Sequence, residues 1–268
     1  MRVVTINVNG LKNAAQAGFF EWMKAQDADV VCVQNLKARV TELDDAIYHP
    51  QGYESFFFDA EDVEQGGVAI YSREMPKAIM TGFAYEPADR QGRFLQADFD
   101  KVSIATVLAP CALGDDDEKQ QEKDDFMDAF LVHLNKTLRK RRQFVFCGSL
   151  HTAHLVTDAS SKYHTLEVSG FLPHERAMLD ELFEEMNYVD AFRAINLDKK
   201  QYTWWPEWAA GWRKQAGWRT DYQIASPALR NNVKDAWIDT ETRFSDHAPL
   251  VVEYDFSAPE QQRRRRRF

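Results

Sequence analysis

Runs of Val and Ile long enough for a buried strand alternate along this chain with segments whose apolar residues recur at helical spacing. The first residues form one such unit. Arg2–Val8 and Asp29–Gln34 have the composition of buried strands, and Phe19, Trp22 and Met23 fall on one helical face between them. A chain that starts with strand, helix and strand is restricted to folds in which helices cover a β-sheet.

The same two patterns continue to the end of the chain. Amphipathic helices are predicted over Phe126–Leu138 and His174–Asn187. Further strands are predicted at Gly66–Ser72, Arg93–Phe99, Val102–Leu108, Gln143–Cys147, Tyr202–Trp205, Thr220–Ala225, Val233–Ile238 and Leu250–Tyr254. We therefore predict an α+β fold with two packed mixed β-sheets flanked by helices. No linker rich in Pro, Gly or Ser divides the chain, so residues 1–256 are expected to form one domain, and residues 257–268 a disordered Arg-rich tail.

The composition excludes several classes of protein. Of the 268 residues, 44% are apolar and 13% aromatic, which is enough to build a core and argues against a disordered chain. No apolar run approaches the length that spans a bilayer, so no contact with a membrane is expected. The sequence begins directly with a strand and shows no signal peptide. Cys32, Cys111 and Cys147 have no metal-binding spacing and are expected to be reduced, which indicates a cytoplasmic protein.

The charge distribution argues against a protein that coats nucleic acid unaided. The net charge is −9, and Arg263–Arg267 contribute +5, which leaves −14 for the rest of the chain. Such an acidic body repels a polyphosphate unless its positive charges are concentrated in one place.

Five ordered segments carry residue types suited to phosphate and metal chemistry. They are Ile6–Gly10, Val33–Lys37, Cys147–His151, Gly217–Tyr222 and Ser245–Leu250. Their order and spacing resemble the exonuclease/endonuclease/phosphatase superfamily, and within it the exonuclease III-type abasic-site endonucleases. The resemblance covers nearly the whole chain, from Met1 to about Phe256. It implies a four-layered sandwich of two sheets between helices, and phosphodiester cleavage that depends on Mg²⁺.

The resemblance is incomplete at the positions that carry the chemistry. Five residues match functional positions of the family: Asn7, Lys37, Asp221, Asp246 and His247. Four depart from it: Asn35 replaces the metal-binding Glu, Ser149 and His151 replace the Asp and Asn of the Gly-Asp-x-Asn motif, and Leu108 replaces a Tyr. Two negative charges are thus missing, and loss of a positioned general base costs about 10²–10⁴-fold in rate. We therefore expect no enzymatic activity, no metal and no cofactor.

Other interpretations of these residues are open. Asn7, Asp221, Asp246 and His247 form either a residual metal or phosphate pocket or a satisfied hydrogen-bond network. His151 is either a substitute general base or a polar residue that fills the place of the Asn. The alternative function is that of a Mg²⁺-dependent DNA-repair nuclease with an altered site, in which His151 and Asp221 transfer the protons.

The segments between these motifs carry a second resemblance. The segments that resemble the family of catabolite repression control proteins of pseudomonads and their relatives are Gln65–Arg73, Ala88–Arg90 with Gly92–Arg93, Leu95–Thr106, Cys147–Leu150 and Gly170–Arg176. This resemblance implies a post-transcriptional regulator that acts with the RNA chaperone Hfq on A-rich mRNA sites and represses translation. It also implies weak or no RNA binding by the protein alone. Whether the chain forms a homodimer is left open.

Clustered basic residues are candidates for contact with RNA or with a partner protein. They are Arg139, Lys140, Arg141 and Arg142 after a helix, Arg230 and Lys234 as an extension, and Arg263, Arg264, Arg265, Arg266 and Arg267 in the tail. The alternative is that the first group is a solvated helix end and that the tail is dispensable. A third hypothesis is a free-standing RNA-binding protein that uses the tail. Five Trp residues either stack on bases or belong to the core: Trp204, Trp205, Trp208, Trp212 and Trp218.

Overall fold

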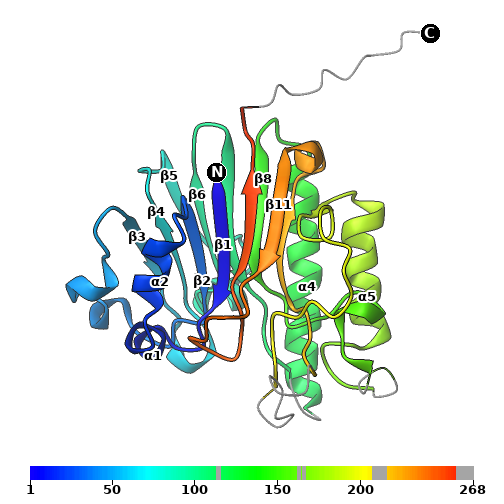
Figure 1. Cartoon of the computed structure of the whole chain (residues 1–268). Coiled ribbons are helices and arrows are strands. Elements are labelled where there is room, and N and C mark those ends of the chain that lie inside the picture. The colour runs from blue at the N-terminus through cyan, green and yellow to red at the C-terminus, as the bar shows by residue number, and fades with distance from the viewer. Residues whose placement is uncertain (113–115, 162–163, 165–166, 207–215, 258–268) are drawn as a thin grey trace.

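Two six-stranded sheets pack face to face in the computed structural model, with helices on both outer faces (Figure 1). The structure describes residues 1–112, 116–161, 164, 167–206 and 216–257. The first sheet has the order β11-β12-β1-β2-β4-β3. Its strands are β1 (Arg2–Asn7), β2 (Val30–Gln34), β3 (Glu54–Phe58), β4 (Val68–Ser72), β11 (Val233–Ile238) and β12 (Leu250–Tyr254).

The second sheet has the order β5-β6-β7-β8-β10-β9. Its strands are β5 (Ala78–Thr81), β6 (Phe94–Asp98), β7 (Val102–Leu108), β8 (Gln143–Ser149), β9 (Val189–Asp190) and β10 (Asp221–Ala225). In each sheet one central pair is parallel, β1 with β2 and β7 with β8, and the other pairs are antiparallel. Both sheets are therefore mixed, as predicted.

The helices cover the two outer faces and complete four layers. Helices α1 (Leu11–Gln16) and α2 (Phe19–Ala25) pack on the first sheet, and α4 (Asp117–Leu138) and α5 (Pro173–Asp180) pack on the second. The remaining helical segments are α3 (Glu86–Arg90), the π-helical turn η6 (Glu181–Glu185), and the 3-10 turns η1 (Val40–Glu42), η2 (Ala46–Tyr48), η3 (Val63–Gln65), η4 (Val156–Asp158) and η9 (Pro227–Asn232). The core between the sheets is made largely of aliphatic residues, whereas α4 packs through a group of Phe rings.

Several local predictions differ from the structure. The first helix is divided at Gly18, whose φ of 90° suits glycine, and the predicted helix over 174–187 ends in the turn η6. Tyr202–Trp205 forms isolated bridges through Trp204 instead of a strand. β3 and β5 were not predicted because they are edge strands without a buried apolar run. The tail beyond Ser257 lies outside the described residues, so its disorder stays a prediction, as does the domain boundary. In the described chain no helix is long and apolar enough to cross a membrane.

The strand directions bring the predicted motifs to one edge of the sandwich. β1 and β2 are parallel, so Asn7 and the residues after Gln34 lie at the same end. β12 runs antiparallel to β1, which places the loop before Leu250 there too. In the second sheet β8 ends and β10 begins at this edge, where Ser149 pairs with Asp221. All five motifs therefore meet across the two sheets.

Candidate active site

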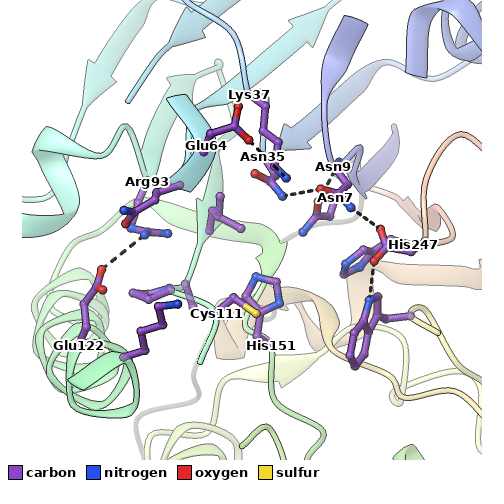
Figure 2. A pocket seen from close by; sticks show the side chains of 17 residues that line it. Asn7, Asn9, Asn35, Lys37, Glu64, Arg93, Cys111, Glu122, His151 and His247 are labelled. Carbon is purple, nitrogen blue, oxygen red and sulfur yellow. Dashed lines mark hydrogen bonds and ion pairs between the residues drawn. The ribbon is translucent and has the colours of Figure 1, made fainter. Parts of the chain in front are cut away.

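A pocket of about 360 Å³ opens at this edge, between loops from both sheets (Figure 2). Six of the eight predicted family positions line it: Asn7, Asn35, Lys37, His151, Asp246 and His247. The other two, Ser149 and Asp221, are buried and do not belong to its lining. Leu108 lines the pocket at the place where the resemblance expects a Tyr.

Asn9, which follows β1, is hydrogen-bonded to the loop after β2 and to the loop before β12. Its backbone N–H donates to Asn7 Oδ1 at 3.1 Å, and its Nδ2 donates to Asp246 Oδ1 at 3.0 Å. Asn35 Nδ2 reaches Asn9 Oδ1 at 3.5 Å. The other oxygen of Asp246 accepts a hydrogen bond from Trp204 Nε1 at 2.8 Å. Both carboxylate oxygens of Asp246 therefore already accept a hydrogen bond from a neighbouring side chain.

His247 is held by a buried carboxylate. Its Nδ1 lies 2.9 Å from Asp221 Oδ2, and both side chains are almost fully buried. Burial by itself lowers the pKa of His247, but the charge and hydrogen bond of Asp221 outweigh it and the pKa is raised. Burial raises the pKa of Asp221, but the charge of His247 and its hydrogen bond to the carboxylate bring the pKa below its ordinary value. The pair therefore favours a charged imidazolium beside a carboxylate.

His151 does not have the properties of a general base. Burial, followed by the nearby charges of His247 and Lys123, lowers the pKa of His151 to about 3. A base is most effective when its pKa is near the working pH. The backbone of His151 is held by Lys123, whose Nζ donates a hydrogen bond to the His151 carbonyl at 2.9 Å. Lys123 is itself held by an ion pair with Glu175 at 2.6 Å. This low pKa argues against His151 as a proton acceptor, and Asp221 is paired with His247. The hypothesis that His151 and Asp221 transfer the protons stays a prediction.

Backbone strain is concentrated at the pocket. Asn9, Asn35, Lys37 and His151 have φ between 46° and 63°. This left-handed region is tolerated by Asn but disfavoured for other side chains, with a cost on the order of 1–3 kcal/mol each. The fold therefore holds Lys37 and His151 in a conformation that is disfavoured for these residue types, which is common at functional sites.

Three cationic side chains line the pocket, Lys37, Arg93 and Lys119, and the first two lie opposite a carboxylate of the pocket wall. Lys37 Nζ is 4.0 Å from Glu64 Oε2, and Arg93 Nη2 is 3.5 Å from Glu122 Oε1 (Figure 2). Arg93 is only 4% exposed, and burial lowers its pKa. Arg93 and Asn9 were missed as site residues by the sequence analysis. The spacing of Asn9 two residues after Asn7 was the available signal, whereas Arg93 had none.

The donor set does not fit a resident magnesium ion. Mg²⁺ needs hard oxygen ligands in near-octahedral order, normally including one or two carboxylates. The oxygens of Asp246 accept two hydrogen bonds, and the Oδ1 of Asn7 accepts the Asn9 N–H. Among the described residues, no group of three His, Cys, Asp or Glu side chains is placed to hold a metal ion. The replacements at Asn35 and Ser149 therefore leave the centre short of charge.

Comparison with known proteins identifies the family. The model of the "Endonuclease/Exonuclease/phosphatase family" matches residues 4–247. The chain belongs to this family. It is 30% identical over 263 residues to a DNA-(apurinic or apyrimidinic site) endonuclease of Dictyostelium discoideum, covering 96% of this chain and 71% of the relative. It is 28% identical over 258 residues to an exodeoxyribonuclease of Bacillus subtilis, covering 94% and 98%.

Solved structures of this endonuclease/exonuclease/phosphatase family agree with the observed architecture. An AP endonuclease from Archaeoglobus fulgidus superimposes with a TM-score of 0.86 at 27% identity, covering 95% of this chain and 99% of that one. A 3′-5′ exonuclease from Neisseria meningitidis gives a TM-score of 0.85 at 25% identity, covering 95% and 100%. The predicted four-layered fold is confirmed.

These relatives contradict the prediction that the chain is not an enzyme. They are named as endonucleases and exodeoxyribonucleases, which are enzymes, and they match almost the entire chain. The prediction inferred complete loss of activity from two missing carboxylates. It gave too little weight to Asp221, Asp246 and His247, which remain together at the pocket.

The predicted basic contacts lie away from the pocket of this family. Arg142 is largely used within the fold, because it donates to the carbonyls of Phe99 and Val102. Lys140 lies 5.5 Å from the ring centroid of Phe144. Arg139 ends α4, Arg141 is exposed, Arg230 lies in η9, and Lys234 donates to the Asn231 carbonyl. Arg263–Arg267 lie outside the described residues, so no contact of the tail is tested.

The Trp residues divide into core and pocket positions. Trp218 is 2% exposed and contacts Trp204 with ring centroids 5.8 Å apart. Trp205 is also buried, whereas Trp204 both packs in this group and faces the pocket. Trp208 and Trp212 lie outside the described residues.

Proposed function

We propose that the chain cleaves phosphodiester bonds in nucleic acid, as a nuclease of the exonuclease III type with an altered centre. The observation that carries this proposal is the Asp221–His247 pair, at 2.9 Å, in which buried Asp221 lies behind His247, and His247 lines the pocket together with Asp246 and Asn7. Asp221 fixes the orientation of the imidazole and favours its charged form. Charged His247 then stabilises the negative charge that develops on the phosphate during cleavage.

The altered centre makes the proposed reaction slow. With a pKa of about 3, His151 is a poor acceptor for the proton of an attacking water. A positioned general base contributes about 10²–10⁴-fold, so a rate lower by that factor than in a complete centre is expected. The resemblance implies a divalent ion for the family's chemistry, and the donor set of this pocket is poorly suited to hold one.

The test is strand cleavage of a labelled duplex that contains an abasic site. The reaction is run in EDTA, in Mg²⁺ and in Mn²⁺, with the original chain, His247→Gln and the matched control His174→Gln, whose side chain is exposed. We expect slow cleavage that falls about 10²-fold in His247→Gln and is unchanged in His174→Gln. Cleavage no faster than the His247→Gln background under all three conditions would refute the proposal.

We propose a second function, translational repression through a complex with Hfq and A-rich mRNA, with weak RNA binding by the chain alone. It is favoured by the placement of the basic residues. Arg139, Lys140 and Arg141 precede β8, whose last residue, Ser149, lies at the pocket edge. Seven strand residues span roughly 20 Å. A polyanion bound at these cations would therefore leave the pocket free.

Arg230 belongs to the same end of the sandwich. The Ser226 N–H donates to the Phe144 carbonyl, and the Phe144 N–H donates to Ser226 Oγ, so η9 lies beside the start of β8. The last described residues leave from there too, since the Asp255 N–H donates to the Asn232 carbonyl. The cytoplasmic location and any self-association stay predictions.

The second function is tested by binding of A-rich RNA with and without Hfq at several salt concentrations. Charge reversal at Arg139, Lys140 and Arg141 together should weaken the ternary complex without loss of the fold. Arg142 is left intact in this variant because its hydrogen bonds support the β6–β7 turn. Unchanged assembly would remove this surface from the proposal, and tight binding that needs no Hfq would favour the free-standing RNA-binding alternative.

A further inference from the structure

A second pocket, with a volume of about 550 Å³, lies beside the pocket of the candidate active site. Adjacent residues of one segment line the two, because Trp204 belongs to the active-site pocket and Trp205 to the second one. The Trp205 N–H also donates to the Asp246 carbonyl at 3.2 Å. None of the residues that line the second pocket lines the active-site pocket, so the two sites are separate.

The second pocket has an excess of positive charge. Its lining contains three cationic side chains, Lys199, Lys200 and Arg243, and one carboxylate, Glu241. The lining of the active-site pocket, in contrast, contains three Lys or Arg side chains and three carboxylates. In a chain with a net charge of −9, this local excess of two positive charges favours an anionic ligand.

Lys199 and Lys200 form no ion pair within the part of the chain that the structure describes. Both side chains are exposed. The lysines of other buried or pocket positions differ in this respect, since Lys37 lies opposite Glu64 and Lys123 pairs with Glu175. An anion that enters the second pocket therefore does not have to displace a described carboxylate from these two ammonium groups.

The segment that leads to the two lysines is anchored to the core. Arg193 Nη1 donates to the Asn196 carbonyl at 3.2 Å and to the Asp198 carbonyl at 2.7 Å. Arg193 is in turn paired with the buried carboxylate of Asp158. The backbone is thus fixed up to the residue before Lys199, which lowers the entropy that a bound ligand would cost.

The floor and the other wall of the second pocket are also fixed. Tyr202 and Trp205 are 5% and 6% exposed, and their ring centroids lie 6.5 Å apart. In the wall, the Asp239 carboxylate accepts hydrogen bonds from the Glu241 N–H at 3.1 Å and from Trp22 Nε1 at 2.8 Å. The pocket is therefore largely formed before a ligand binds, as is usual for small-molecule sites.

The size and the polar groups of the second pocket suit a phosphorylated small molecule. Its volume lies within the range of about 300–1,000 Å³ that is typical of ligand pockets. A phosphate monoester carries a charge of about −1.5 to −2 at neutral pH, which matches the excess of cations. Glu241 and the amide oxygen of Gln201 are acceptors, which suit the hydroxyl groups of a sugar.

We propose that the second pocket binds a small phosphate monoester that carries a sugar, that is, a nucleotide or a sugar phosphate. Lys199 and Lys200 hold the phosphate, and Arg243 adds to the positive charge around it. Glu241 and Gln201 accept hydrogen bonds from the sugar. This site goes beyond the proposed nuclease function and does not depend on it.

The experiment measures binding to the full chain in EDTA by titration calorimetry. The ligands are AMP, glucose 6-phosphate, adenosine, inorganic phosphate and an oligonucleotide without a terminal phosphate. At least one of the two esters should bind more tightly than adenosine and inorganic phosphate, and the tighter ester identifies the kind of ligand. The proposal is overturned if neither ester binds, if inorganic phosphate or adenosine binds as tightly, or if only the oligonucleotide binds.

Amide chemical shifts locate the bound ester. The signals of Lys199–Gln201 and Thr240–Arg243 should move as the ester is added, whereas those of Asn35–Lys37 in the active-site pocket should not. Movement confined to Asn35–Lys37 would place the ester in the active-site pocket and overturn the proposal.

The lysine pair is tested by the double variant Lys199→Gln/Lys200→Gln. It should weaken binding of the ester about 10-fold or more, because hydrogen bonds to charged groups are lost. The matched control Lys24→Gln/Lys101→Gln removes the same charge at two exposed positions elsewhere and should leave binding unchanged. Equal weakening in both variants would show that only the overall charge matters, which overturns the site.

The carboxylate is tested by Glu241→Gln. The variant removes a charge that repels any anion, and it also weakens the acceptor that the sugar uses. The preference of the chain for the ester over inorganic phosphate should therefore fall several-fold. An unchanged preference would overturn the assignment of the sugar to this wall, and with it the choice of a sugar-bearing ester.

Discussion

The pocket and the ion cluster around Asp158 are both built from buried polar side chains, but they satisfy them differently. Asp158 is fully buried and accepts hydrogen bonds from Arg219 Nε at 3.0 Å, Arg219 Nη2 at 2.9 Å and Arg193 Nη2 at 2.5 Å. Arg219 also donates to Asp190 Oδ2 at 2.7 Å. Burial alone would raise the pKa of Asp158. The charges and hydrogen bonds of Arg219 and Arg193 outweigh this effect and bring the pKa well below its ordinary range. In the pocket, by contrast, Asn7 Nδ2 has no hydrogen-bond partner within the part of the chain that the structure describes, and Lys37 and Arg93 lie 4.0 Å and 3.5 Å from their carboxylates.

The difference separates a structural role from a ligand-binding role. In the Asp158 cluster the carboxylates are saturated, and the Arg219 guanidinium also lies 4.6 Å from the ring centroid of Tyr222. Among the described residues, Arg219 Nη1 and Arg193 Nε in this cluster have no hydrogen-bond partner, but both guanidinium groups are already held by carboxylates through their other nitrogens. Buried polar groups are almost always hydrogen-bonded in folded proteins, so an exception calls for an explanation. At the pocket the strained backbone of Lys37 and His151 points to the same explanation, a site arranged for a ligand.

The largest effect is expected when the saturated cluster is broken. Asp158→Asn removes the negative charge between two buried guanidinium groups and should lower the free energy of unfolding by about 3–5 kcal/mol. The pKa of Asp158 is depressed in the folded state, so its contribution is complete above the unfolded pKa of about 3.9 and is lost as the pH falls below that value. Urea unfolding at several pH values measures both effects.

The matched control is Glu253→Gln, which alters an ion pair with Arg2 whose side chains are about a third exposed. It should change the stability far less than Asp158→Asn. Equal losses in the two variants would show that the buried cluster has no special role.

The second prediction restores to the pocket the charge that it lacks. In the double variant Asn35→Glu/Ser149→Asp, two carboxylates join Asp221 and Asp246, so the chain should be less stable than the original in EDTA and stabilised by Mg²⁺. At an ion concentration of about 100 times the dissociation constant the gain is about 2.7 kcal/mol. Thermal unfolding with and without Mg²⁺ measures it.

The uncharged double variant Asn35→Gln/Ser149→Asn is the control, and its unfolding should not depend on Mg²⁺. If the original chain is stabilised by Mg²⁺ as much as the charged variant, the poor fit of the present donor set for the ion is disproved.

The sequence predicted the inner strands of both sheets and the edge strand β11, and it missed the other three edge strands, β3, β5 and β9. β1, β2, β7 and β12 carry buried Val and Ile runs, which require no knowledge of their neighbours. β3 and β5 are edge strands with mixed burial, and their pairing depends on β4 and β6. The break in the first helix depends on Gly18, a single residue inside an otherwise continuous pattern.

At the site, motif spacing identified most of the residues but could not predict their protonation states or the neighbours that packing brings to them. The positions of Asn7, Asp246 and His247 followed from the motifs, and the structure brings them into one pocket. The pKa of His151 could not be predicted, because it depends on burial and on charges from distant segments such as Lys123. Likewise, Arg93 becomes a pocket residue only through the packing of α4 near β6, which places Glu122 opposite it.

The third prediction concerns His133, a half-buried histidine outside the pocket lining. His133 is packed among Phe83, Phe94 and Phe146, and among the residues that the structure describes its Nε2 has no hydrogen-bond partner. Burial, followed by the charges of Lys140 and Lys136, lowers its pKa from 6.5 to about 4. The unfolded chain therefore binds a proton below pH 6.5 that the folded chain resists, and stability is lost as the pH falls from 6.5 to 4.

His133→Phe should flatten this part of the stability profile, as measured by unfolding midpoints between pH 7 and pH 4. His174→Gln, at an exposed histidine, should leave the profile unchanged. An equally steep loss of stability in His133→Phe would mean that other groups cause it. A flattened profile would show that an unpartnered polar group outside a pocket only costs stability, which sharpens the contrast with Asn7.

The smallest effect is expected where charges are paired in solvent. Arg90 and Glu61 form a bidentate contact, with Nε at 2.9 Å and Nη2 at 2.7 Å from Glu61 Oε2, and both side chains are more than half exposed. The hydrogen bond from Arg90 lowers the pKa of Glu61, yet water and salt screen most of the attraction. Glu61→Gln should therefore leave the unfolding midpoint unchanged within error. A measurable loss at physiological salt would show that short distance alone, without burial, gives an ion pair in this fold its stabilising effect.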